Sequence, residues 1–547
     1  MRRASYMIAV FVRFGFASIL HSVALDRFLR RRDKPGEKAD AATAGLAMPV
    51  RLRLALEEIG ATAIKIGQVL STRPDLLPPD YIYELRKLQE EVPPFPYEQV
   101  QQILEQELGA PFEELFAEFD PEPLGSASLS QVHAARLLTG QKVAVKVQRP
   151  EVAELIETDL AVMRWAARQA SKYSQWAREQ NLTDWANEIA RILRHELDFI
   201  REAKNAQRMR ENLADEPRAL VPRVFEEYTT HRVLTSQLVT GADINQEDQL
   251  RELDIDRHEV ARAFAQIMLR QTIADGFFHA DPHGGNLKIT PDDRIAFFDF
   301  GHMGTAGPQL RNSIAQGINA LLNGDTDEIV AIITNVGMIG EQTDLRMLRL
   351  DIDKQVSEYW GASAGQMAMA EIIEDLLGLL LRYNIRMPPA WISLLRAMTI
   401  SEGVCLQLDP DFDFQEVAAE AAREMMLERL RPTNILKSLG QLGHELNQYA
   451  LRLPRQLSQL LLRIQVTGLK VQLELEEADR PLRKLDTMVN RLAFSIIVAA
   501  MIIASAMILS SEQALAALGY PATAVLTAIG TIMGLWLLYS ILRSGRL

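Results

Sequence analysis

The sequence has few of the residues on which several functional classes depend. Its 547 residues include one cysteine, Cys405, which excludes an intramolecular disulfide and any zinc or iron–sulfur centre built from several thiolates. Basic residues are outnumbered: 59 Lys and Arg stand against 72 Asp and Glu, and the formal net charge is −13. A chain this acidic has no general electrostatic attraction for nucleic acid, so we expect no nucleic-acid partner.

The rest of the composition is that of an ordinary globular protein. Hydrophobic residues make up 48% of the chain, charged residues 24% and aromatic residues 7%, which argues against wholesale disorder. At about 150 residues per domain, the length allows two to four domains.

Charge is nearly absent from residues 492–542, which contain no Lys or Arg and one acidic residue, Glu512. Two apolar runs, 492–510 and 522–542, are each about 20 residues long, the length that a helix needs to cross ~30 Å of hydrocarbon. Basic residues flank the pair, and the positive-inside rule then places both ends in the cytoplasm. We predict two transmembrane helices that anchor the chain in the cell (inner) membrane, with a buried helical hairpin in a soluble core as the alternative.

The N-terminal residues 1–32 are basic and apolar, with no acidic residue before Asp26. Arg13 interrupts the apolar run and no small-residue cleavage site follows, so a secretory signal is not predicted. We predict an amphipathic segment that lies on the membrane surface, with a transit peptide as the alternative. Residues 33–48 have the composition of a linker.

A change from helical periodicity to short alternating runs begins near residue 121. Residues 142–147 form a strongly β-forming run with a Val-Ala-x-Lys pattern that ends on Lys146, and residues 123–133 before it form a loop of small residues between two strand candidates. Small side chains let backbone N–H groups approach phosphates closely. This order, a loop and then a strand with a lysine, is typical of the N-lobe of a kinase, although an exposed strand with one Lys explains the run alone equally well.

A second set of polar residues follows in the order that phosphoryl transfer requires. His279, Asp281 and Asn286 give the pattern H-x-D-x-x-x-x-N, and Asp299-Phe300-Gly301 comes after a predicted hairpin. A carboxylate can orient the acceptor hydroxyl and accept its proton, while an Asn and a second Asp can hold Mg²⁺. A zinc site at His279, Asp281 and His283 is the weaker interpretation, because it leaves Asn286 and Asp299 unexplained.

Two helical patches set this chain apart from ordinary protein kinases. Lys65 and Gln68 share one face of a predicted helix ahead of the N-lobe, in the sequence Lys-Ile-Gly-Gln. Three carboxylates, those of Glu196, Asp198 and Glu202, fall within a short stretch after the predicted strands. From spacing alone, solvated amphipathic helices explain both patches at least as well.

Together these elements closely resemble the AarF/UbiB family of atypical kinases. The resemblance runs in order from about Leu54 to Gly304, and the lysine helix and the Glu-x-Asp element are specific to that family. The resemblance implies bound ATP or ADP with Mg²⁺, and an alanine-rich loop in place of the glycine-rich loop. The loop of this chain is poorer in alanine, which leaves its nucleotide preference open, and Gly284 stands where many members have Pro.

The resemblance also implies a role for each matching residue. Lys146 would contact the α- and β-phosphates and pair with Glu202, Asp281 would be the catalytic base, and Asn286 and Asp299 would bind Mg²⁺. Lys65, counted with Lys146 and Asp281 among the catalytic residues, would guard the cleft and face Glu196 and Asp198. The predicted nucleotide contacts and cleft residues are completed by Gly125, Ser126, Ala127, Ser128, Gln237, Val239 and Gln68.

Two regions beside these motifs allow fold-level predictions. Residues 232–241 resemble the last N-lobe strand running into the hinge, where the backbone of 237–239 would meet adenine; a plain edge strand is the alternative. After Gly301 the sequence passes directly into a helical pattern at 308–323, with no long activation segment and no Ala-Pro-Glu. Because a protein kinase seats its peptide on that segment, ordinary protein phosphorylation is disfavoured.

We therefore predict an α+β, protein-kinase-like, two-lobed fold, with a small β-rich N-lobe, a helical C-lobe, an N-terminal helical extension and a C-terminal transmembrane helical hairpin. The predicted domains are an amphipathic segment 1–32, a linker 33–48, a helical extension 49–120, an N-lobe with a helical insert 121–240, a C-lobe 241–430, an amphipathic helical region 431–491 and the transmembrane pair 492–542.

The leading functional hypothesis is a membrane-anchored atypical kinase or ATPase whose core lies in the cytoplasm. The resemblance implies support of isoprenoid quinone biosynthesis, with membrane lipids, quinone precursors and quinone-biosynthesis enzymes as partners. A nucleotide-gated lipid-binding scaffold and a small-molecule phosphotransferase are the alternatives. The sequence leaves the phosphoryl acceptor and the oligomeric state open.

Overall fold

The computed structural model describes residues 2–22, 45–71, 77–88, 92–179, 181–253, 255–337, 339, 343–361, 369–383, 385 and 387–429. All of them belong to one compact unit, Met1–Lys437. None of the helices in these ranges combines the length and the apolar character that crossing a membrane requires. The predicted transmembrane pair, the amphipathic region 431–491 and most of the linker 33–48 lie outside the described residues, so they stay predictions.

The N-lobe is built on a four-stranded antiparallel sheet of order β1-β2-β3-β5. Its strands are β1 (Phe116–Ser126), β2 (Ser130–Leu137), β3 (Lys142–Gln148) and β5 (Val233–Gln237). Strand β1 begins earlier than the predicted start at 121. On β3, Val143, Val145 and Val147 are fully buried against a core that includes helix α6 (Tyr97–Leu108), while the short helix α7 (Phe112–Leu115) leads into β1. Because side chains alternate along a strand, Lys146 lies on the opposite face of the sheet from these valines.

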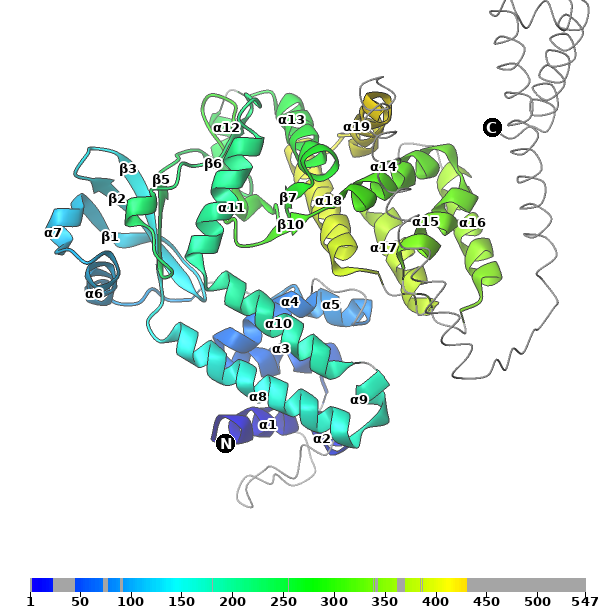
Figure 1. The fold of residues 1–547 in the computed structure, drawn as a ribbon, viewed down its shortest axis with the longest axis horizontal. Coiled ribbons are helices and arrows are strands. Elements are labelled where there is room, and N and C mark those ends of the chain that lie inside the picture. The colour runs from blue at the N-terminus through cyan, green and yellow to red at the C-terminus, as the bar shows by residue number, and fades with distance from the viewer. Residues whose placement is uncertain are drawn as a thin grey trace, which may run out of the picture. The chain divides into compact units, whose positions relative to one another are not determined.

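The predicted helical insert lies between β3 and β5. It contains α8 (Val152–Tyr173), α9 (Gln175–Glu179), α10 (Leu182–Glu196) and α11 (Phe199–Asn212). The helical extension supplies α3 (Met48–Ile59), α4 (Ala61–Ser71) and α5 (Pro79–Leu85), and these three helices pack on one another. Figure 1 shows α3 and α4 beside the long helices α8 and α10, and contacts join α4 to both of them.

The N-terminal residues pack against the chain itself. Helix α1 (Arg2–Phe11), a π-helical turn (Val12–Phe16) and α2 (Ala17–Ser22) bury Val10 and Phe14 in the same cluster as Leu56 on α3. Arg3 donates to both carboxylate oxygens of Asp159 on α8, each at 2.7 Å. Helices α3 and α8 thus cover part of the apolar face of this segment, and the expectation that residues 1–32 lie on a membrane surface stays a prediction.

The C-lobe is mainly helical. Its helices are α12 (Glu247–Glu252), α13 (Arg257–Leu269) with a π-helical turn (Arg270–Asp275), α14 (Pro308–Asn323), α15 (Thr326–Val336), α16 (Leu345–Gly361), α17 (Met369–Arg382), α18 (Pro389–Leu408) and α19 (Phe414–Arg429). One sheet has the order β4-β9-β8-β6, and its strands are β4 (Ala219–Leu220), β9 (Ile295–Phe297), β8 (Leu287–Ile289) and β6 (Ala242–Asp243). The other sheet pairs β7 (Phe277–His279) with β10 (Met303–Thr305).

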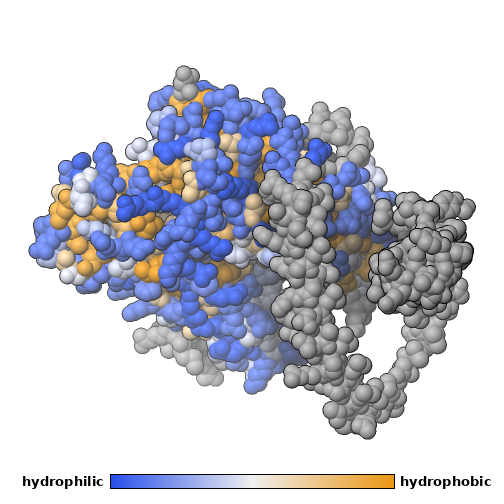
Figure 2. Space-filling model, turned by 45° about the horizontal axis from the view of Figure 1, so that its top comes forward, coloured by the Kyte–Doolittle hydropathy of each residue, from blue (hydrophilic) through white to orange (hydrophobic). Residues whose placement is uncertain are grey.

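The core of the C-lobe joins these strands to α13 and α18. Phe264 on α13 is fully buried and stacks on Phe297 of β9, with ring centroids 6.2 Å apart. The predicted hairpin before Asp299 is present as β8 and β9, and α14 begins at Pro308, directly after β10, so the expectation of no long activation segment is confirmed. On the face drawn in Figure 2, hydrophobic residues gather toward the N-lobe end. Leu124 and Leu138 of the N-lobe are exposed.

Candidate active site

The first element of the site is an ion pair between the N-lobe sheet and α11. Lys146 Nζ on β3 donates to both carboxylate oxygens of Glu202, at 2.8 and 2.9 Å. Burial disfavours the charged ammonium, but the carboxylates of Asp299 and Glu202 outweigh that cost and raise the pKa of Lys146. Burial also raises the pKa of Glu202, against the attraction of Lys146. Lys146 is therefore held as a cation at a fixed position, as a phosphate-binding lysine requires.

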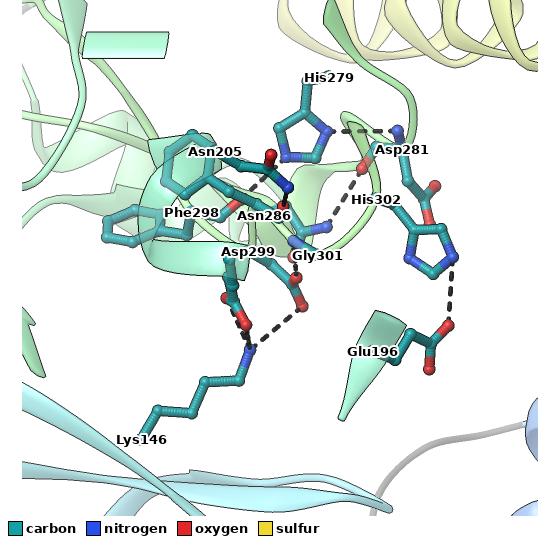
Figure 3. Close-up of polar contacts among 12 residues, drawn as sticks. Lys146, Glu196, Asn205, His279, Asp281, Asn286, Phe298, Asp299, Gly301 and His302 are labelled. Atoms are coloured by element: carbon teal, nitrogen blue, oxygen red, sulfur yellow. Dashed lines mark hydrogen bonds and ion pairs between the residues drawn. The ribbon is translucent and has the colours of Figure 1, made fainter. Parts of the chain in front are cut away.

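Asp299 approaches the same ammonium from the C-lobe. Its Oδ2 lies 3.9 Å from Lys146 Nζ, and its Oδ1 accepts a hydrogen bond from Gly301 N at 3.1 Å (Figure 3). The charge of Lys146 holds the pKa of Asp299 below its usual range. Asp299 is thus ionised, and 48% of its side chain remains exposed and able to receive a further cation.

The backbone at Asp299 is left-handed, with φ of +53°. Asp is one of the few residues that tolerate this region, because its short side chain bonds to the local backbone, here at Gly301. The next residue is also fixed from α11, because Asn205 Nδ2 donates to Phe300 O at 2.8 Å. Helix α11 therefore positions both Lys146, through Glu202, and the Asp-Phe-Gly turn.

His279 organises the loop that carries Asp281. The ring is fully buried, and burial lowers its pKa. Asp281 N donates to His279 Nδ1 at 3.2 Å, so Nδ1 is an acceptor, and Nε2 must carry the proton that it shares with Phe298 O at 3.0 Å. The neutral imidazole thus ties Asp281 to the residue before Asp299, which argues against the alternative zinc interpretation.

Asn286 links the loop of Asp281 to the residue before Asp299. Its Nδ2 donates to Asp281 O at 3.1 Å, and its backbone carbonyl accepts from Phe298 N at 2.9 Å. The Asn286 amide oxygen and the Asp299 carboxylate are the hard oxygen ligands that Mg²⁺ prefers. Because Asp299 is ionised, this donor set fits Mg²⁺, and these two residues would hold it.

The lysine helix α4 reaches the edge of the same site. Lys65 Nζ lies 3.5 Å from Glu196 Oε2, and His302 Nε2 lies 3.2 Å from Glu196 Oε1. Glu196 therefore faces Lys65, as expected. Asp198 lies elsewhere: its Oδ1 bonds to His231 Nδ1 at 2.9 Å, just before α11 begins. Asp198 follows the end of α10 and pairs with the N-lobe residue His231, so its approach to Lys65 stays a prediction.

The other residues of the Lys-x-Gly-Gln element pack within the helical extension. Gln68 Nε2 donates to Leu88 O at 3.2 Å, so this side chain binds the segment that follows α5 rather than the carboxylates beside Lys65. A Cβ at Gly67 would lie 2.4 Å from Leu88 Cδ1 and 2.8 Å from Leu56 Cδ1. Glycine at this position lets α4 approach α3 and the residues after α5 closely, and this packing fixes where Lys65 projects.

The predicted phosphate loop, Gly125 to Ser128, is held by a residue that the sequence did not point to. Arg149, after β3, donates from Nε to Ala127 O and from Nη2 to Ser126 Oγ, both at 2.8 Å, and reaches Pro93 O at 2.9 Å. The loop turns tightly, with Ala127 N donating to Ser130 O at 2.8 Å. The guanidinium thus joins the loop to the segment that follows the lysine helix.

The predicted hinge is only partly available to a base. Gln237 N donates to Arg223 O at 2.8 Å and Leu238 N to Lys142 O at 3.1 Å. These two N–H groups are used within the N-lobe, so adenine recognition through the backbone of Gln237 would have to use its carbonyl. Val239 follows in the segment between β5 and β6 and stays a predicted contact.

Comparison with known proteins identifies the family. Residues 87–333 match the ABC1 atypical kinase-like domain, 352–413 the UbiB helical domain and 476–543 the ABC1/UbiB kinase-like C-terminal domain. A probable protein kinase UbiB of Marinobacter nauticus is 33% identical over 422 residues, which cover 76% of this chain and 77% of that protein. The chain belongs to the AarF/UbiB family of atypical kinases.

Other relatives are spread over bacteria and plants. An uncharacterized protein of Synechocystis is 34% identical, covering 89% of this chain and 83% of its own length. Protein ACTIVITY OF BC1 COMPLEX KINASE 7, chloroplastic, of Arabidopsis thaliana is 33% identical over 79% of this chain, which spans 63% of that longer protein. A solved structure of a Mycobacterium tuberculosis protein in complex with erythromycin covers 67% of this chain and 93% of its own, at 23% identity and a TM-score of 0.47.

One departure from the AarF/UbiB pattern has a local structural partner. A Cβ at Gly284 would lie 2.4 Å from Asn245 Oδ1, so glycine here leaves room for the Asn245 side chain beside the catalytic loop.

Three residues of the site were not predicted from any sequence motif: Arg149, His302 and Arg396. Arg396, on α18, donates from Nη2 to Asp281 Oδ1 at 2.9 Å. A faint signal existed for it, because Arg396 and Glu402 are the only charged residues within the apolar sequence of α18.

Proposed function

We propose that this AarF/UbiB protein binds Mg-ATP and transfers its γ-phosphoryl group to water or to a small, lipid-like acceptor. One observation carries the proposal: the Lys146 ammonium is held between Glu202 and Asp299, and the loop bearing Asp281 and Asn286 is hydrogen-bonded to the residues around Asp299. A cation for the phosphates, a base and two metal ligands are the parts that phosphoryl transfer requires.

The proposed division of roles is the one that the family resemblance implies, and the geometry is compatible with it. Lys146 binds the phosphates, and Asp281 accepts the proton of the attacking hydroxyl or water as the bond between the γ-phosphorus and the β–γ bridging oxygen breaks, giving ADP and phosphate or a phosphorylated acceptor. Bound at Asn286 and Asp299, Mg²⁺ would neutralise charge on the phosphates. Asp299, ionised by Lys146, needs no deprotonation before it binds the ion.

A non-peptide acceptor is favoured because β10 passes directly into α14. The chain offers no long segment there on which a peptide could lie, and Lys65 of α4 reaches Glu196 at the same site. The apolar runs within 492–542 suggest that the acceptor, or the regulator of turnover, is a membrane lipid. Support of isoprenoid quinone biosynthesis is what family membership implies, and a quinone precursor is the acceptor we would test first.

The test is Mg²⁺-dependent phosphate release by the full chain in detergent, with and without vesicles containing anionic lipid. We expect turnover that vesicles stimulate and that Asp299→Asn abolishes. Asp292→Asn is the matched control, because that aspartate lies in the β8–β9 hairpin, pairs with Arg294 and is 59% exposed. It should turn over like the wild type.

The other outcomes separate the alternatives. Nucleotide binding without turnover under any lipid condition would favour a nucleotide-gated scaffold, in which Lys65 and Glu196 only report the bound state. Phosphate appearing on a soluble amino alcohol or sugar would favour a small-molecule phosphotransferase. Equal turnover in Asp299→Asn and the wild type would overturn the proposed site.

A further inference from the structure

The proposed catalytic base has a charge partner from a distant part of the chain. Arg396 Nη2 lies 2.9 Å from Asp281 Oδ1, and 31% of the Arg396 side chain and 22% of the Asp281 side chain are exposed. Within the described residues this is the only hydrogen bond that the Arg396 guanidinium makes. Asp281 Oδ2 accepts no hydrogen bond from the described part of the chain, so one carboxylate oxygen is held and the other is free.

The catalytic loop has no cation of its own. In the H-R-D form of this loop an arginine precedes the aspartate. Here Ala280 stands in that place, and residues 279–286 contain no Lys or Arg. The positive charge beside the Asp281 carboxylate comes instead from Arg396 on α18.

Helix α18 is firmly packed in the C-lobe and can hold such a contact in place. It buries nine residues along its length, among them Ala397 and Leu394 on either side of Arg396. Its other charged residue, Glu402, has a structural role: its two carboxylate oxygens accept from Met369 N and Ala370 N, each at 2.6 Å, where α17 begins. Among the described residues, Arg396 has no comparable bond to the backbone of a neighbouring helix.

We propose that Arg396 is a positioning residue for phosphoryl transfer: it holds Asp281 through Oδ1 so that Oδ2 receives the proton of the acceptor. This inference rests on the proposed function, because it assigns Asp281 the part of the base. The free oxygen can meet an acceptor only in a narrow range of side-chain orientations. A carboxylate without its partner samples other rotamers, and a displacement of about 1 Å at the reacting atoms can cost roughly 10²-fold in rate.

The test compares Arg396→Ala and Arg396→Lys with the wild type by steady-state phosphate release and by nucleotide titration. We expect kcat to fall by about 30- to 100-fold in Arg396→Ala, with nucleotide affinity within about twofold of the wild type, because the lost interaction acts on chemistry rather than on binding. Arg396→Lys keeps one charged N–H donor and should recover most of the rate. Added guanidinium ion should also restore part of the Arg396→Ala rate, which a merely structural role would not allow.

The matched control is Arg262→Ala, which removes an arginine of α13 that pairs with Glu420 at 3.1 Å on the surface. Its kcat should stay at the wild-type value. An Arg396→Ala kcat within about twofold of the wild type overturns the proposal, as does a loss explained entirely by weaker nucleotide binding. If Arg396→Ala unfolds, Arg396→Lys decides: a folded Lys variant with the Ala-like loss of rate overturns the proposal, and one with near-normal rate supports it.

Failure of this inference is distinguishable from failure of the proposed function. If the wild type turns over and Asp299→Asn does not, the active site stands whatever the Arg396 variants do. If Asp299→Asn retains full turnover, the proposed function fails first.

Discussion

The ammonium nitrogen of Lys146 lies 3.9 Å from Oδ2 of Asp299, so a cation on the N-lobe sheet faces an acid that follows a C-lobe strand. Glu202 accepts from the same ammonium through both of its oxygens. Two carboxylates thus face one ammonium group, so the three side chains together carry a net negative charge. That excess suits a site for Mg²⁺.

The first prediction concerns the Lys146–Glu202 pair. Glu202 is 5% exposed, so Lys146→Met leaves its carboxylate buried without a partner, and we expect a loss of about 3–5 kcal/mol in the free energy of unfolding. Because burial already raises the pKa of Glu202, the loss should be larger at pH 8 than at pH 5, where Glu202 can take up a proton. Urea unfolding at both pH values measures this.

The double variant Lys146→Met/Glu202→Gln should recover a large part of that stability, because the buried charge is gone. Arg262→Met is the control: its pair with Glu420 has side chains 37% and 47% exposed, so a loss below about 1 kcal/mol is expected. Equal losses in the Lys146 single and double variants would contradict the argument.

The parts of the site that could be predicted are those with local spacing. Asp281, Asn286 and Asp299 lie on one loop and one hairpin, so their order in the sequence determines their neighbourhood. The pairing of Lys146 with Glu202 needed the family resemblance, because a helical insert separates β3 from α11. Nothing in the sequence distinguished Arg149 from other arginines, and the charge of Arg396 within an apolar helix did not say that its partner is the distant residue Asp281.

The N-terminal segment shows a second reason why some contacts could not be predicted. Its hydrophobic pattern was read correctly as one apolar face, but a pattern does not say what covers that face. Arg3 and Asp159 supply the specific contact, and each residue alone is an ordinary charged residue in a helix.

A second prediction concerns the phosphate loop. Arg149→Met removes the donors to Ala127 O and Ser126 Oγ, so the loop should become mobile and lose part of its preorganisation for phosphate. We expect the nucleotide Kd to rise about tenfold, equivalent to ~1.4 kcal/mol, with a smaller change in kcat. Calorimetric titration with Mg-nucleotide measures the change.

The control for Arg149 is Arg136→Met on the neighbouring strand β2. Its pair with Glu118 is surface-exposed, with side chains 40% and 69% accessible, and its removal should leave the Kd unchanged. An unchanged Kd in Arg149→Met would mean that the loop holds its shape without the guanidinium.

A third prediction concerns acid sensitivity. Burial lowers the pKa of both His133 and His279, so the unfolded state takes up protons at a higher pH than the folded state does. Stability should therefore fall as pH drops below about 6.5, by up to roughly 1.4 kcal/mol per pH unit for each histidine. The exposed His258, whose pKa Asp409 raises, has the opposite sign: its contribution is present at low pH and is lost as pH rises.

Urea unfolding between pH 7.5 and 5 tests the sign, and His133→Gln should reduce the slope. In the wild type, His133 Nδ1 donates to Asp120 O at 2.8 Å and Nε2 accepts from Gln131 Nε2 at 2.9 Å, and the second of these bonds needs the neutral ring. His258→Gln is the control and should make the slope slightly steeper. If the free energy of unfolding instead rises on acidification, protonation of His133 and His279 does not determine the pH dependence.

The last prediction tests whether the N-terminal segment is docked on the chain or lies on a membrane. Asp159 is fully buried and bound by Arg3, which also donates to Ile59 O at 3.2 Å. Arg3→Met leaves Asp159 unpaired at a cost of about 3–5 kcal/mol, which undocking of residues 2–22 can relieve. We expect limited proteolysis to cut that segment much faster in Arg3→Met, and Asp159→Asn in the same chain to restore protection.

The control is Arg13→Met, whose arginine pairs with Glu58 at the surface and is 45% exposed; this variant should remain protected. Wild-type protein cut as quickly as Arg3→Met, and protected only when vesicles are added, would return the segment to the membrane surface.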